Sequence, residues 1–79
     1  MPRSTESPDW VVHRRRALGA NLRAARLAAN LTQEQVALMT GIDRATYNRI
    51  EQGHSSPLVD TLFLVADAIG VPLADLVRE

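Results

Sequence analysis

Four hydrogen-bonding side chains and one methyl group fall on a single face of a short predicted helix. On a 3.6-residue wheel they lie within roughly 140° of one another; they are Arg44, Ala45, Asn48, Arg49 and Gln52. Tyr47 and Ile50 fall on the opposite side, where they can anchor the helix in a core. Because arginine, asparagine and glutamine bond to base edges in the DNA major groove, the pattern predicts a DNA-reading helix.

The twenty residues from Gln33 to Gln52 have the spacing of a helix, a glycine turn and a second helix. A small residue, Ala37, stands at the fifth place, where the two helices cross closely, and Gly41 stands at the ninth, where the turn needs a positive φ. Apolar residues occupy the fourth, tenth, fifteenth and eighteenth places: Val36, Ile42, Tyr47 and Ile50. This spacing predicts a helix-turn-helix.

A long helix is expected before this motif, from about Asp9 to Ala29. We expect a flexible arm at residues 1–8, with Ser7-Pro8 as the N-cap and first helical residue. Asn30 is predicted to end this helix in the left-handed conformation. Three- and four-residue spacing predicts an inward face made of Leu18, Leu22, Ala25, Arg26 and Ala29.

Capping residues set the bounds of the other helices. Thr32-Gln33-Glu34-Gln35 is a capping box that begins the second helix, and Asp43 caps the third, which Gly53 stops. Ser56-Pro57 repeats the cap-then-proline pattern for a fourth helix, and Pro72 opens a short fifth. The inward residues of the last two helices are predicted to be Val59, Leu62, Val65, Ala66, Ile69, Leu73 and Leu76. With no strand pattern, we expect an all-α domain at residues 9–79.

Composition narrows the function classes. A chain of 79 residues makes one small domain, and the absence of cysteine excludes disulfides and thiolate metal sites. No apolar run approaches the ~20 residues that span a bilayer, and the N-terminus lacks the order of a signal peptide, so we expect a cytoplasmic protein away from membranes. The zero net charge hides an uneven distribution: residues 1–30 carry net +4 and residues 31–79 carry net −4.

At this point the sequence resembles the phage-repressor/Cro-type helix-turn-helix family, often called XRE. The likeness covers about residues 17 to 78 and rests on Leu22-Arg23-Ala24-Ala25-Arg26, Leu31-Thr32-Gln33-Glu34-Gln35-Val36-Ala37, Gly41-Ile42-Asp43-Arg44, Ile50-Glu51-Gln52-Gly53 and the run from Pro57 to Val71. The resemblance implies a compact five-helix fold of the phage repressor type.

The resemblance also implies roles for individual residues. Base-reading positions are Arg44, Ala45, Asn48 and Arg49, and DNA-backbone positions are Gln33, Gln52, His54 and Ser55. Gln33 is also expected to brace a side chain of the reading helix. Arg26 and Glu51 match a pair that ties the first helix to the end of the third; they are either that pair or two unrelated surface charges.

Departures from the family pattern suggest a further contact surface. Ala45 offers only a methyl group, which can contact a thymine methyl but cannot form a hydrogen bond. Leu38, Met39, Phe63 and Leu64 are apolar where the family often has polar residues. We interpret Phe63 and Leu64 as a homodimer or partner contact, against the alternative of scattered exposed apolar residues. Arg14-Arg15-Arg16 is either a phosphate-binding patch or a solvated first turn.

These observations predict a sequence-specific transcriptional regulator that binds double-stranded DNA as a homodimer on a near-palindromic operator. The alternative is an antitoxin or other partner-binding module with the same fold. We expect no enzyme, because the sequence has no nucleophile–base pair, paired acid site or phosphate loop. No cofactor, metal or small-molecule substrate is expected, and His13 and His54 lack ligands at metal spacing.

Overall fold

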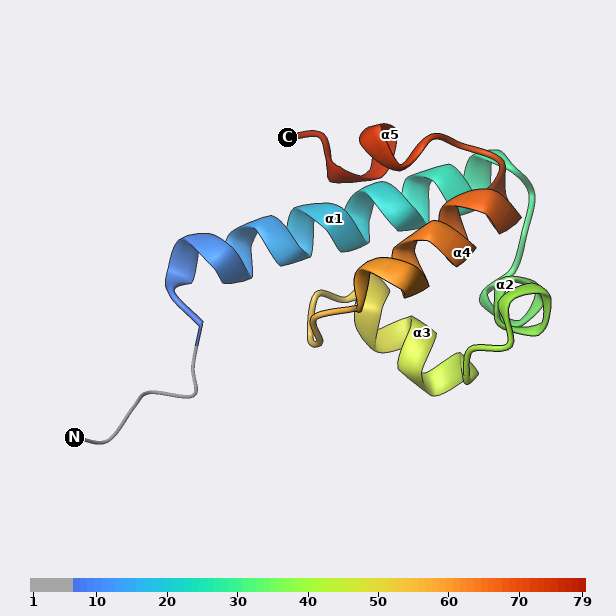
Figure 1. The fold of residues 1–79 in the computed structure, drawn as a ribbon, viewed down its shortest axis with the longest axis horizontal. Helices are drawn as coiled ribbons and strands as arrows, with labels where there is room; N and C mark the ends of the chain where they lie inside the picture. Colours follow the sequence, from blue (N-terminus) through green and yellow to red (C-terminus); the bar gives the residue numbers. More distant parts are fainter. Residues whose placement is uncertain (1–6) are drawn as a thin grey trace.

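Five α-helices build residues 7–79, the part of the chain that the computed structural model describes (Figure 1). They are α1 (Asp9–Ala28), α2 (Gln33–Thr40), α3 (Arg44–Glu51), α4 (Val59–Ile69) and α5 (Leu73–Val77). The predicted all-α, five-helix fold is confirmed, with no strand in this part of the chain. Residues 1–6, most of the predicted arm, lie outside the described residues.

The long helix α1 supports the shorter helices. α3 and α5 pack against it, α2 packs against α3 and α4, and α4 contacts α5; in Figure 1, α5 lies above α1 and α3 below it. The backbone of α3 lies directly against α1 at Gly19, where a β-carbon would overlap the carbonyl oxygens of Glu51 and Ile50. The sequence pattern did not single out this glycine, because a glycine within a helix predicts only a loss of helix stability.

Each helix contributes one large, fully buried side chain to a common core: Leu22, Val36, Tyr47, Val65 and Leu76. Two predicted inward residues, Ala29 and Val59, are exposed instead. Ala29 follows the last residue of α1, just before the chain turns at Asn30 with a φ of 59°. Val59 is the first residue of α4 and is 59% exposed.

Most predicted helix ends are confirmed. The capping box of Thr32 and Gln35 is present, and Gly41 ends α2 with a φ of 77°. The predicted start of α1 at Asp9 is confirmed, but its N-cap is Pro8, without a side-chain cap, and not Ser7. The start of α4 was predicted wrongly, because its N-cap is Leu58 and not Ser56. The start of α4 is later than predicted because Leu58 has an extended backbone, with φ −67° and ψ 152°.

Candidate nucleic-acid interface

The outward face of α3 carries the predicted base-reading residues. Arg44, Ala45 and Arg49 are exposed, and Asn48 is half-buried. Tyr47 and Ile50 occupy the opposite face and are buried in the core. The helix therefore presents two guanidinium groups, an amide and a methyl group to a partner, while its other face is fixed by packing.

The turn between α2 and α3 is held by side-chain hydrogen bonds. The Thr40 hydroxyl donates to the Val36 carbonyl at 2.8 Å and accepts from the Ile42 amide at 3.3 Å. The Asp43 carboxylate caps α3 by accepting from the amides of Ala45 and Thr46, at 3.1 and 3.3 Å. These bonds set the direction in which α3 leaves α2.

A buried ion pair ties α1 to the end of α3. Arg26 Nε donates to Glu51 Oε2 at 2.7 Å, and the Arg26 Nη2 donates to Oε1 at 3.1 Å, so the pair is bidentate. Only 9% of the Arg26 side chain and 2% of the Glu51 side chain are exposed. The third donor, Arg26 Nη1, reaches the Leu31 carbonyl at 2.9 Å and so fixes the segment before α2.

Gln33 extends this network to the reading face. Its Nε2 atom donates to Glu51 Oε1 at 3.1 Å and to Asn48 Oδ1 at 3.0 Å. Both amide hydrogens are therefore used within the protein. Its main-chain N–H lies in the first turn of α2, where an amide has no partner within the helix.

The charges in this network are set by mutual contact. Burial alone would raise the pKa of Glu51, but hydrogen bonds from Arg26 and Gln33 outweigh it and lower the pKa below its ordinary value of 4.5. The bond to Glu51 raises the pKa of Arg26. Burial, and then the neighbouring Glu51 carboxylate, raise the pKa of Tyr47, whose hydroxyl makes no hydrogen bond within the described residues. At neutral pH, Arg26 and Glu51 are charged and Tyr47 is neutral.

The loop after α3 is anchored on α1. Arg15 Nε donates to the Gly53 carbonyl at 2.9 Å, and Gly53 has a φ of 75°, with a β-carbon there meeting the Arg16 backbone. This contact positions the predicted backbone-binding residues next to Gly53, of which Gln52 and His54 are exposed and Ser55 is half-buried. Sequence reasoning missed this role of Arg15, since three successive arginines gave no indication of which one faces α3.

Arg14 differs from its two neighbours in its contacts. It lies over the Trp10 ring, 5.4 Å from the centroid, and its Nη2 atom lies 3.1 Å from Glu79 Oε2 in an exposed ion pair. Arg16 is exposed beside Gly53. The three side chains therefore do not form one continuous patch.

The predicted contact residues of α4 are open to solvent. Phe63 is 54% exposed and Leu64 is 51% exposed. On α2, Leu38 and Met39 are more exposed still, at 79% and 58%. Apolar side chains of this size at such exposure are available to a partner.

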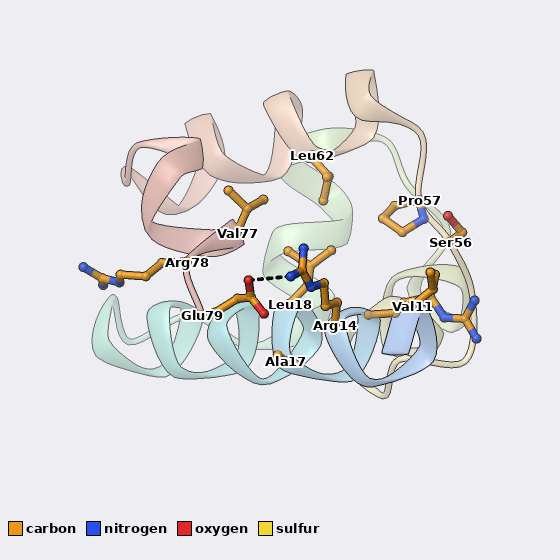
Figure 2. A pocket seen from close by; sticks show the side chains of 11 residues that line it. Val11, Arg14, Ala17, Leu18, Ser56, Pro57, Leu62, Val77, Arg78 and Glu79 are labelled. Carbon is orange, nitrogen blue, oxygen red and sulfur yellow. Dashed lines mark ion pairs between the residues drawn. The ribbon is translucent and has the colours of Figure 1, made fainter. Parts of the chain in front are cut away.

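A cavity of about 370 Å³ lies between α1 and the C-terminal segment (Figure 2). Leu18, Leu62 and Val77 give it apolar walls, and the Arg14–Glu79 ion pair crosses it. The described residues contain no group of three or more His, Cys, Asp or Glu side chains that could hold a metal ion. None of the helices in residues 7–79 is long and apolar enough to cross a membrane.

Comparisons with known proteins agree with this geometry. A helix-turn-helix family pattern matches residues 22–76. The chain is 37% identical over 60 residues to the cryptic phage CTXphi transcriptional repressor RstR of Vibrio cholerae, covering 76% of this chain and 54% of the repressor. It thus spans about half the length of that relative. It is also 35% identical over 63 residues to the HTH-type transcriptional regulator y4dJ of Sinorhizobium fredii, covering 80% of this chain and 82% of the regulator.

Among solved structures, the chain is similar to the restriction-modification controller protein C.AhdI from Aeromonas hydrophila. The two share a TM-score of 0.75 and 28% sequence identity. The match covers 77% of this chain and 92% of the controller protein. The likeness therefore extends over nearly the whole of that controller protein.

Proposed function

We propose that this protein is a cytoplasmic transcriptional regulator that binds double-stranded DNA. The chain belongs to the helix-turn-helix family HTH_3. One observation carries this proposal. The face of α3 that holds Arg44, Asn48 and Arg49 reaches solvent, while Tyr47 and Ile50 are buried behind it. A helix fixed in this way can enter the major groove without rearranging the core.

In this proposal, one group of residues contacts the bases and a second group contacts the DNA backbone. Arg44 and Arg49 can each bond in bidentate fashion to guanine, and the Ala45 methyl can contact a thymine methyl. Asn48 reads a further base. The backbone contacts come from the main-chain N–H of Gln33 in the first turn of α2 and from Gln52, His54 and Ser55 around the end of α3.

We further propose that two copies bind a near-palindromic operator. A single α3 reads few base pairs, and a symmetric dimer doubles the contacts at half-sites about one helical turn, ~34 Å, apart. The exposed Phe63 and Leu64 on α4 are the apolar surface that we assign to the contact between copies.

Selection of bound sequences from a random duplex pool tests this function directly. We expect an enriched, near-palindromic site whose half-sites are about 10 base pairs apart. Enrichment of single half-sites would contradict the dimer, and no enrichment at low ionic strength would contradict DNA reading by α3.

A second candidate is an antitoxin or another partner-binding module that uses the same fold. The observation in its favour is the exposure of Leu38 and Met39 on α2, outside the α4 surface assigned to the dimer. A protein that binds its operator unchanged after both residues are replaced by serine, but no longer co-purifies with a host protein, would support this role.

A further inference from the structure

Hydrogen bonds within the free protein fix the orientation of the Asn48 side-chain amide. Gln33 Nε2 donates to both Glu51 Oε1 and Asn48 Oδ1, at 3.1 and 3.0 Å. A side-chain amide nitrogen carries two hydrogens and accepts none. The atom of Glu51 and the atom of Asn48 that face this nitrogen must therefore both be acceptors.

Glu51 sets the direction of this chain of bonds. It is 7% exposed and bonded twice by Arg26, and an ionised carboxylate can only accept. If Gln33 turned its oxygen inward, that oxygen would face the buried Glu51 carboxylate without a hydrogen between them, which is costly. Gln33 must then present nitrogen, Asn48 must present Oδ1 to it, and the Asn48 Nδ2 group is the part left for DNA.

We propose that Glu51, acting through Gln33, commits Asn48 to donate a hydrogen bond to its base, and that the Gln33 side chain orients Asn48 rather than contacting phosphate. This inference rests on the function proposed above. Asn48 then selects a base edge that offers an acceptor, such as a purine N7 or thymine O4, and rejects cytosine, whose major-groove group is a donor. Gln33 and Glu51 are positioning residues for this choice.

Replacing Gln33 by alanine tests the orienting role. The amide of Asn48 is then free to turn over, so preference at the one base pair read by Asn48 should fall about two- to twelvefold, the range of one neutral hydrogen bond. Affinity for non-specific duplex should change less than the preference at this base pair, because the main-chain N–H of residue 33 remains. The matched variant is Gln52→Ala, since Gln52 is an exposed glutamine at the end of α3 and should lose affinity for all sequences alike.

Replacing Asn48 by aspartate tests the direction of the bond. The acceptor that faces Gln33 is kept, while the outward donor becomes an acceptor. Preference at that base pair should invert toward cytosine, whose N4 amino group donates. Both variants are compared by competition binding against duplexes that carry each of the four bases at each position of the selected site, after their melting curves have shown that they are folded.

Two results would overturn the inference while leaving the proposed function intact. One is a Gln33→Ala variant that loses affinity equally for every duplex, which is the pattern of a phosphate contact. The other is a selected cytosine at the base pair read by Asn48. A measurement on the free protein is independent of DNA: the Gln33 side-chain amide hydrogens should exchange with water more slowly than those of Gln52, and equal rates would contradict the network. If no duplex is bound selectively, the proposed function fails instead.

Discussion

Removal of the Glu51 carboxylate should destabilise the whole domain, although Glu51 is buried and makes none of the proposed DNA contacts. Glu51→Ala strands the Arg26 guanidinium, whose side chain is 9% exposed, without its two charged bonds. Loss of one member of a buried pair costs about 3–5 kcal/mol. A domain of this size has a total stability of about 4–12 kcal/mol, so this variant is expected to be marginally folded.

Thermal unfolding followed by circular dichroism measures the effect. In a domain of this size, a change of 1 kcal/mol in the free energy of unfolding shifts Tm by about 4–8 °C, so a loss of ~3 kcal/mol lowers Tm by about 12–24 °C. Asp67→Ala on the exposed side of α4 is the surface-carboxylate control and should change little. The double variant Arg26→Met with Glu51→Leu should recover most of the loss, because no charge is then stranded. A Glu51→Ala protein that melts with the wild type would refute the reasoning.

Four further outcomes are expected. Gly19→Ala should lower the free energy of unfolding by about 1–3 kcal/mol despite the better helix propensity of alanine, because its β-carbon overlaps the Glu51 carbonyl. An unchanged or raised Tm would show that α1 and α3 separate freely. Since the pKa of Glu51 is lowered in the fold, its charge adds to the free energy of unfolding above pH 4.5, and this contribution is lost as the pH falls through the lower folded-state pKa. The Tm of Glu51→Gln should therefore depend less on acid pH than the Tm of the wild type. Arg44→Ala should cost about 1–3 kcal/mol of specific affinity and relax one base position in competition binding, whereas an equal loss for all duplexes would assign Arg44 to phosphate. Leu64→Glu should weaken the dimer in sedimentation at micromolar concentration, and a wild-type monomer would remove the interface.

The helix caps and turns could be predicted because they depend on interactions between residues close together in the sequence. The Thr32 capping box, the left-handed Gly41 and the Asp43 cap each depend on residues within three or four positions, and all three are present as predicted. The burial of Tyr47 and Ile50 follows from helical spacing alone. In contrast, the Ser56-Pro57 pattern did not give the start of α4, because Leu58 remains extended and the helix begins only at Val59.

The parts of the site that were not predicted depend on contacts between segments that are far apart in the sequence. Gly19 matters because the backbone of α3 lies against it, and Arg15 matters because it reaches the Gly53 carbonyl 38 positions away. The same holds for Gln33, whose bracing role the resemblance implied but whose two bonds appear only once α2 and α3 are placed together. The buried pair under α3 therefore has two effects that can be measured separately. Its carboxylate keeps the buried Arg26 paired, which melting detects, and its acceptor oxygen orients two amides, which amide hydrogen exchange and the base preference at one position of the duplex detect.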